Sequence, residues 1–256
     1  MEPDREHPTR DVDSPAPPEI EDQAEAAGWY PNLCDQRYPR LRPSARANVP
    51  GDRADVANSR PHRAIEVYLG DYIDRGPDSA LTLDLLIDRS HRGNTVFLKG
   101  NHEAFLAEVF RNPSRMADWF QVGGQQTLMS YGLSPSPSPR DEEQRALVRE
   151  LQAAMPPQHR EFLKHLRLSF TCGDFFFVHA GVKPGVPLIV QREADLLWIR
   201  DEFLQSKEHF GKYVIHGHTP VRSAEVLTNR ANIDTGAYAT GNLTLLSIQG
   251  SSLLAV

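Results

Sequence analysis

Four short apolar runs in this chain each end just before a residue that can bind a metal ion or carry a proton. The runs span residues 65–69, 95–98, 174–178 and 213–215, and each has the length and composition of a buried strand. The polar residues that follow them are Asp71, Asn101, His179, and the pair His216 and His218. Because strand ends in layered α/β folds open onto a shared crevice, we expect these side chains to converge.

Helical patterns alternate with these runs. Apolar residues at helical spacing predict helices over residues 79–89, 103–110, 116–129, 141–154, 159–166 and 196–205, the third of them interrupted at Gly123-Gly124. The final segment, residues 224–256, alternates like antiparallel strands joined by turns. Helices that alternate with strands, followed by a run of strands, favour a layered α/β architecture.

Composition divides the chain into two parts. Residues 1–63 contain 10 of the 20 prolines, none of the 11 phenylalanines and none of the 5 lysines. Because such a segment has little apolar surface to bury, we expect it to be disordered. The folded domain is then expected to cover residues 64–256.

Composition also argues against several classes of protein. No apolar run approaches the ~18 residues of a membrane helix, and the net charge of −6 disfavours a general nucleic-acid binder. No secretory signal pattern opens the sequence, and the two cysteines, Cys34 and Cys172, are too few for a disulfide framework. We therefore expect a cytoplasmic protein that contacts neither nucleic acid nor membrane.

The first motif is GDYIDRG, residues 70–76. Asp71 and Asp74 offer two carboxylates, and Arg75 offers a planar fork that suits phosphate oxygens. Taken alone, the motif fits a turn with a solvated ion pair equally well.

The second motif is GNHE, residues 100–103. Asn101 can supply an amide oxygen ligand, His102 an imidazole, and Glu103 a supporting carboxylate. Taken alone, the motif fits better a helix start capped by Asn101.

Two histidine motifs follow, HAG at residues 179–181 and HGHT at residues 216–219. His179 ends a buried strand, although a single buried histidine is more often part of the core. His216 and His218 point to opposite sides of an extended chain, so we expect one of them to face the site. Oxygen and imidazole ligands together suit manganese, iron or zinc, and the joint occurrence of four such motifs favours a functional site.

The combination resembles the calcineurin-like metallophosphoesterases, and within them the phosphoprotein phosphatases in their bacterial and phage form. LLWIRDEF (196–203) and NIDTGA (232–237) extend the resemblance, which covers about residues 64–250. It implies an α/β (α+β) fold of four layers, a central β-sandwich flanked by helices. It also implies a hydrolase that uses two divalent metal ions, with manganese favoured over iron or zinc.

The resemblance also implies a role for each site residue. Asp71 would bridge the two metals, and Asn101, His179 and His218 would complete the shell of the second metal. His218 is preferred to His216 because it stands in the family's Gly-His-Thr pattern. His102 would be the general acid, oriented by Asp74. Arg75, Arg200 and Asn101 would bind the substrate phosphate. Without the resemblance, Arg200 would be interpreted as a charge on a helix surface.

One family motif is missing. Gly-Asp-x-His-Gly should precede Gly70 and supply the Asp and His ligands of the first metal, but no Asp-x-His occurs in residues 1–69. The codons of residues 32–40, read one base later, permit Ile-Tyr-Ala-Ile-Ser-Asp-Ile-His-Gly, which contains the missing Asp-x-His-Gly after a strand-like run. We hypothesise a single-base insertion or deletion near codons 59–63 and an out-of-frame start. DNA sequence without the shifted motif would refute this.

The sequence thus predicts a metal-dependent phosphomonoester hydrolase, with serine/threonine protein phosphatase as the main hypothesis. Its substrate would be a phosphorylated protein or a small phosphoester. A second hypothesis is a dinucleoside polyphosphate hydrolase acting on diadenosine tetraphosphate. A third is an inactive phosphate-binding pseudophosphatase that has lost the first metal.

Overall fold

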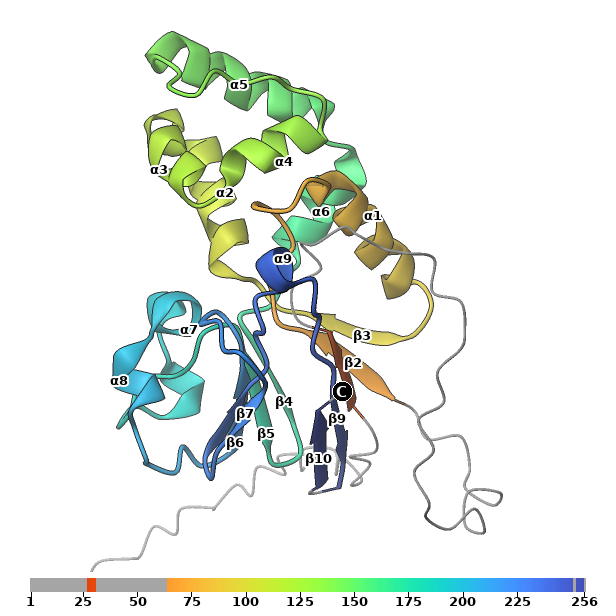
Figure 1. Ribbon diagram of the computed structural model, residues 1–256, viewed down its shortest axis with the longest axis vertical. Coiled ribbons are helices and arrows are strands. Elements are labelled where there is room, and N and C mark those ends of the chain that lie inside the picture. The colour runs from red at the N-terminus through yellow and green to blue at the C-terminus, as the bar shows by residue number, and fades with distance from the viewer. Residues whose placement is uncertain (1–26, 31–63, 251, 256) are drawn as a thin grey trace, which may run out of the picture.

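The computed structural model describes residues 27–30, 64–250 and 252–255. Two five-stranded sheets face each other at its centre (Figure 1). The first sheet has the order β10-β9-β1-β2-β3. Its strands are β1 (Ala27–Tyr30), β2 (Ile65–Tyr68), β3 (Asn94–Phe97), β9 (Leu246–Gln249) and β10 (Ser252–Ala255). Strand β1 runs parallel to β2 and antiparallel to β9, so it joins the two halves of this sheet.

The second sheet has the order β4-β5-β6-β8-β7. Its strands are β4 (Ser169–Cys172), β5 (Phe175–Val178), β6 (Tyr213–His216), β7 (Glu225–Val226) and β8 (Arg230–Asn232). Strands β5, β6 and β8 are parallel, so their carboxyl ends lie at one edge. Side chains of both sheets form the core between them: Val67, Leu69, Leu98, Phe177, Ile215, Ala231, Ile233, Leu246 and Ile248.

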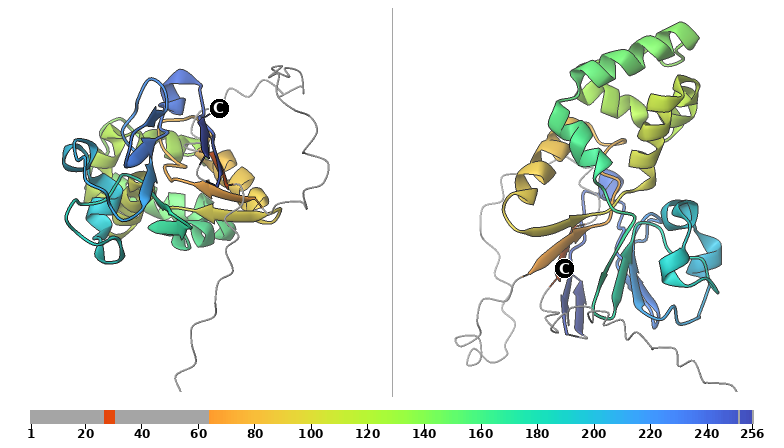
Figure 2. Two further views of the ribbon diagram at one scale, coloured as in Figure 1. Left: turned by 90° about the horizontal axis from the view of Figure 1, so that it is seen from below. Right: turned by 180° about the vertical axis from the view of Figure 1, so that it is seen from behind.

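Six helices form a lobe at the end of the sandwich where the strands open (Figures 1 and 2). They are α1 (Ser79–Ser90), α2 (Asn101–Arg111), α3 (Met116–Gln121), α4 (Gly124–Ser130), α5 (Asp141–Ala154) and α6 (Pro157–Lys164). Helix α5 shows why they pack as they do. Asp141, Glu142 and Glu143 lie in its first turn, near the positive end of the helix dipole, and it buries Leu147, Val148 and Leu151 on one face.

Two helices, α7 (Glu193–Trp198) and α8 (Asp201–Leu204), cover the outer face of the second sheet (Figure 1). Short 3-10 turns lie at Pro113–Arg115 and Leu188–Val190, and α9 (Ala237–Thr240) precedes β9. Helices thus flank a β-sandwich, as the resemblance implies. No helix in the described part of the chain is long and apolar enough to cross a bilayer.

The structure corrects several predicted elements. The single helix predicted over residues 196–205 is wrong, because the chain leaves the helical region at Ile199 and Arg200. Ile199 has an extended backbone (ψ 141°) and its side chain packs into the core beneath α7, which separates α7 from α8. Helix α9 interrupts the C-terminal strands between Gly236 and Gly241, both left-handed, and strand β4 was not predicted.

Strand β1 lies inside the segment that composition predicts to be disordered. Residues 1–26 and 31–63, with Cys34 and the segment of the proposed frame change, lie outside the described residues. The prediction of disorder for those residues stays a prediction, and so does the frame change.

Candidate active site

The polar residues at four strand ends meet in one buried cluster. Asp71 follows β2, Asn101 begins α2, His179 follows β5 and His218 follows β6. The Nε2 atom of His179 lies 2.9 Å from Asn101 Oδ1, 3.2 Å from His218 Nδ1 and 3.4 Å from Asp71 Oδ1. The Nδ1 atom of His218 lies 2.8 Å from Asn101 Oδ1. Both sheets therefore contribute to a single set of ligand atoms.

The hydrogen bonds around this cluster leave it rich in lone pairs. The Nδ1 atom of His179 donates to the Leu69 carbonyl oxygen, 2.7 Å away, which leaves Nε2 as the ring nitrogen that faces Asn101 and can present a lone pair. His218 Nε2 is buried and has no partner among the described residues. Ligands held ~2.1 Å from one ion lie roughly 3.0–3.4 Å apart, close to the separations found here. One divalent cation would satisfy these facing acceptors.

The described residues do not provide a comparable group of ligands for the other ion, the first metal of a two-metal site. Residues 27–30, 64–250 and 252–255 contain one group of at least three metal-ligating His, Cys, Asp or Glu side chains, formed by Asp71, His179 and His218. Apart from the shared Asp71, this part of the chain supplies no group of ligands for a second ion. The loss of the first metal site through the missing Gly-Asp-x-His-Gly motif stays a prediction, because residues 31–63 lie outside the described part of the chain.

A second imidazole stands beside the cluster. His102 Nδ1 lies 2.8 Å from Asp74 Oδ2, while His102 Nε2 lies 4.0 Å from Asp71 Oδ2. Asp74 is fully buried and also accepts hydrogen bonds from Trp119 Nε1 (2.9 Å) and Thr127 Oγ1 (2.6 Å). This fixes the ring so that Nδ1–H points at Asp74 and Nε2 points at the cluster.

Burial alone would lower the pKa of His102. The carboxylates of Asp71 and Asp74 outweigh the burial and raise this pKa to about 9. By contrast, burial lowers the pKa of His218 to about 3, so His218 is a neutral ring with a free lone pair. The two histidines are thus suited to different tasks, His102 to carrying a proton and His218 to binding a cation.

Glu103 supports the turn that carries Asp71. Its carboxylate accepts hydrogen bonds from the backbone N–H groups of Asp71 (2.9 Å), Tyr72 (2.6 Å) and Gly100 (2.7 Å). A Cβ on Gly70 would lie 2.6 Å from the Gly100 Cα, so the ends of β2 and β3 touch only because both residues are glycines. The GDYIDRG and GNHE motifs, which are separate in the sequence, are thus held together by the Glu103 carboxylate.

Four residues other than glycine have a left-handed backbone in the described part of the chain: Asp71, Asp74, Arg75 and His218. All four belong to the predicted site. Such a conformation costs roughly 1–3 kcal/mol at each residue and persists only where the surroundings enforce it. Stored strain of this kind is concentrated at functional sites in proteins, which adds independent support for the site.

The two predicted phosphate-binding arginines are exposed. The guanidinium of Arg75 lies over the Tyr238 ring, 4.5 Å from its centroid, and the Arg75 N–H donates to Gly123 O at 3.1 Å. Arg200 lies between α7 and α8 and its charge contributes to the low pKa of His218. The break in the predicted helix therefore places Arg200 near the cluster rather than along a helix surface.

His216 lies apart from the cluster. It is completely buried, 3.1 Å from an Arg230 guanidinium nitrogen, and its ring stacks edge-on against Phe203. Burial and the charge of Arg230 lower its pKa to about 3. The HGHT motif thus directs one histidine into the core and the other into the cluster.

Sequence reasoning missed three residues that shape this site: Trp119, Thr127 and Tyr238. Trp119 and Thr127 read as part of a helical stretch, and Tyr238 as part of a turn between strands. No local pattern marks them, because their partners Asp74 and Arg75 lie more than 40 residues away in the chain.

A family model described as calcineurin-like phosphoesterase matches residues 53–241, most of the chain. The chain belongs to the calcineurin-like phosphoesterase family. Serine/threonine-protein phosphatase 1 of Salmonella typhimurium is 28% identical over 198 residues, which cover 74% of this phosphoesterase and 81% of that protein. A bis(5'-nucleosyl)-tetraphosphatase of Bacillus velezensis, PrpE, is 25% identical over 195 residues, 70% of this chain and 72% of that one.

The solved structures agree on the fold. A crystal structure of a proposed diadenosine tetraphosphatase superposes with a TM-score of 0.55 and 16% identity, and covers 91% of this phosphoesterase and 93% of that chain. The prediction of a metallophosphoesterase of α/β class is confirmed, and with it a hydrolytic enzyme that acts on phosphoesters.

Proposed function

We propose that this phosphoesterase removes phosphate from phosphoserine and phosphothreonine in proteins, with water as the nucleophile. One observation supports this most strongly: an acid–base histidine, held by a buried carboxylate, stands 4.0 Å from a cluster that fits a metal ion. Water attack on phosphorus needs both parts, a cation to bind the phosphoryl group and an acid to protonate the departing oxygen.

Asp71, Asn101, His179 and His218 would hold the metal ion. When bound, the ion supplies a Lewis acid that acidifies water and neutralises charge on the phosphoryl oxygens. We propose manganese, because the set combines hard oxygen ligands with two imidazoles. A second ion, which the family resemblance implies, has no ligand group of its own in the described residues.

His102 would act as the general acid. As the bond between phosphorus and the seryl oxygen breaks, His102 Nε2 gives its proton to that oxygen, and water supplies the oxygen that completes inorganic phosphate. Asp74 stabilises the protonated ring through Nδ1. This pairing keeps the acid oriented and charged before the reaction begins.

Arg75 and Arg200 would bind the equatorial phosphate oxygens, with the Asn101 amide as a further contact. Each guanidinium is exposed and offers a fork of N–H donors that matches a phosphate group. The ring of Tyr238 beneath Arg75 holds that side chain at the site by a cation–π contact.

The compartment we propose is the cytoplasm. Cys172, the one cysteine among the described residues, is a free thiol, and the chain has one other cysteine, which fits a reducing environment. Phosphoproteins and small phosphoesters are the proposed partners.

Hydrolysis of diadenosine tetraphosphate is a second candidate. Four bis(5'-nucleosyl)-tetraphosphatase relatives are 22–25% identical to this chain, which is close to the 26–28% identity of two bacterial serine/threonine phosphatases. The DRGPDS and GNHE forms of the motifs favour the protein phosphatase.

The test compares a phosphothreonine peptide with diadenosine tetraphosphate on the full chain in manganese. We expect kcat/KM for the peptide to be the larger by at least tenfold, as judged by phosphate release. The opposite ratio would favour the nucleotide hydrolase. No turnover of either substrate, with phosphate binding retained in calorimetry, would identify a phosphate-binding protein without activity.

A further inference from the structure

The rings of the two histidines in the cluster are held in different ways. His179 Nδ1 donates to the Leu69 carbonyl oxygen at 2.7 Å, so a hydrogen bond to the backbone fixes the side of the ring that faces away from the cluster. His218 Nδ1 lies 2.8 Å from Asn101 Oδ1, and its Nε2 is buried without a hydrogen-bond partner in the described part of the chain. The Nε2 side of His218 is therefore held by packing alone.

The packing contact comes from Trp198, the last residue of α7. The rings of Trp198 and His218 are nearly perpendicular, at 83°, with 6.2 Å between their centroids. Aromatic rings prefer such edge-to-face pairs. His218 also has a left-handed backbone, with φ +66°, which persists only where the surroundings enforce it. The contact with Trp198 is thus a restraint on a residue that needs one.

Trp198 is itself firmly placed, although 45% of it is exposed. The next residue, Ile199, is buried in the core, and the Leu196 carbonyl oxygen accepts a hydrogen bond from the Ala180 N–H at 2.9 Å. On α2, the Phe105 ring meets the Trp198 ring edge-on, 6.5 Å between centroids. Contacts from the second sheet and from the helical lobe therefore fix the indole beside the cluster.

We propose that Trp198 is a positioning residue for the metal ion and keeps the His218 imidazole turned with Nδ1 toward the other ligands. The inference rests on the proposed metal site and adds to it a residue that contributes no ligand atom. The indole N–H is a donor only and offers no lone pair to a cation, so Trp198 acts through His218.

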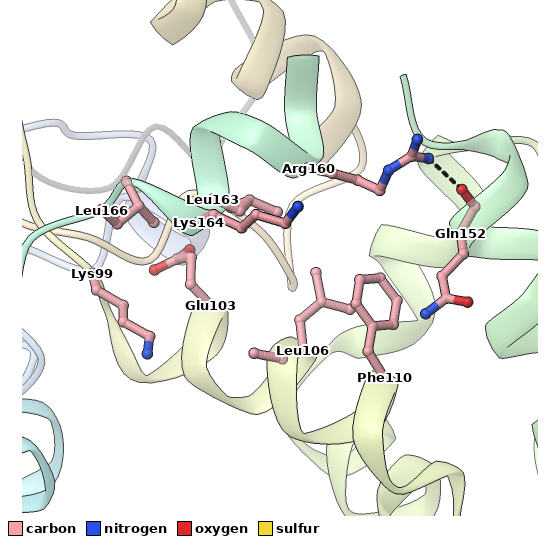
Figure 3. Close-up of a pocket in the computed structure, with 10 residues that line it drawn as sticks. Lys99, Glu103, Leu106, Phe110, Gln152, Arg160, Leu163, Lys164 and Leu166 are labelled. Carbon is pink, nitrogen blue, oxygen red and sulfur yellow. Dashed lines mark hydrogen bonds between the residues drawn. The ribbon is translucent and has the colours of Figure 1, made fainter. Parts of the chain in front are cut away.

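Helix α2 provides a control for the loss of an aromatic ring. Phe110 lies on this helix beyond Phe105 and packs against the core of the helical lobe. Together with Leu106 and Leu163 it lines a pocket of about 570 Å³ between α2 and α6 (Figure 3). Phe110→Ala therefore removes a ring from the same lobe while the contact between Trp198 and His218 stays intact.

Isothermal titration calorimetry of the full chain with manganese, without any phosphoester, tests the proposal. Loss of an outer contact of a metal-binding histidine commonly costs about 10–100-fold in metal affinity, so Trp198→Ala should weaken manganese binding about tenfold. Trp198→Phe keeps a ring against His218 and should retain most of the affinity. Phe110→Ala should bind manganese as the unaltered chain does. If a thermal melt shows that Trp198→Ala is unfolded, Trp198→Leu replaces it.

Equal manganese affinity of Trp198→Ala and the unaltered chain would overturn the proposal. If that variant instead raised KM for a phosphothreonine peptide at unchanged manganese affinity, Trp198 would be a substrate contact and not a positioning residue. Failure of the unaltered chain to bind manganese would be a different result. It would show that the proposed metal site is wrong, and this inference with it.

Discussion

His102 is held from one side only, which leaves its other ring nitrogen free for chemistry. Asp74 binds Nδ1, and the orientation of Asp74 is in turn fixed by Trp119 and Thr127. His102→Asn should therefore lower kcat for a phosphothreonine peptide by about 10²–10⁴-fold, the usual contribution of a general acid. The loss should be much smaller for 4-nitrophenyl phosphate, whose leaving group needs no proton.

His91→Asn is the matched control, since His91 is exposed at the end of α1. We expect its kinetics to equal those of the unaltered chain. Equal losses of His102→Asn on both substrates would contradict the acid role and leave His102 a structural residue.

Glu103 gives a second test at the scale of one residue. Its two carboxylate oxygens accept three backbone N–H groups, and Glu103→Gln would bring an amide N–H₂ against one of these donors. Leaving a buried donor unpaired costs roughly 1–3 kcal/mol, so the free energy of unfolding in urea should fall by about that amount. Glu108→Gln, in an exposed ion pair with Arg115, should change it by much less.

A site residue could be predicted where it directly follows a strand that the sequence pattern itself reveals. Asp71, Asn101, His179 and the pair His216 and His218 each follow a recognisable strand, so their types and positions sufficed to predict that such residues converge. The choice of His218 over His216 needed the family resemblance. Trp119 and Thr127 could not be predicted, because only the packing of the α3–α4 region against the GDYIDRG turn brings them to Asp74.

At the scale of elements, the break between α3 and α4 positions Arg75. Gly123 at this break has φ +102°, and a Cβ there would lie 2.6 Å from the Arg75 backbone nitrogen. Gly123→Ala should therefore cost ~1–3 kcal/mol of stability through strain, with further loss from the clash. It should also weaken inhibition by inorganic phosphate, because Arg75 must move.

Gly132→Ala provides the comparison within the same lobe. Gly132 also has a positive φ, +80°, but its Cβ would meet open space. We expect a loss of stability from backbone strain alone and unchanged inhibition by phosphate. Equal phosphate inhibition in both variants would show that the α3–α4 break does not position Arg75.

The main helices and strands followed from periodicity, and the interruption at Gly123-Gly124 followed from its two glycines, whereas the break between α7 and α8 did not follow from the sequence. Helix α5 spans the predicted residues, since one apolar face and an acidic first turn define it locally. The separation of α7 from α8 depends instead on where Ile199 finds space in the core, a tertiary effect that helical spacing cannot reveal.

For the molecule as a whole, the structure predicts an unequal metal content. One cluster of four ligands fits an ion, and the described residues supply no ligand group for a second. Mass spectrometry of the manganese-loaded protein should therefore find close to one ion per chain, and activity on an aryl phosphate should be weak.

The frame-corrected chain is the comparison for this prediction. A sequence with Ser-Asp-Ile-His-Gly restored before Gly70 should bind two ions and be markedly more active. Two ions in the uncorrected chain, or equal activity of both proteins, would contradict the idea that the first metal site has been lost.

Strand β1 sits in the middle of the first sheet, with β2 on one side and β9 on the other. Trimming the chain to residues 64–256 would not remove a dispensable tail. It would divide one continuous sheet into two separate strand pairs, β10–β9 and β2–β3. Each pair would then have an unpaired strand edge that can recruit strands from other molecules. A shortened protein should therefore precipitate during purification. That precipitation would result from a boundary chosen on composition alone, and not from a defect of the enzyme.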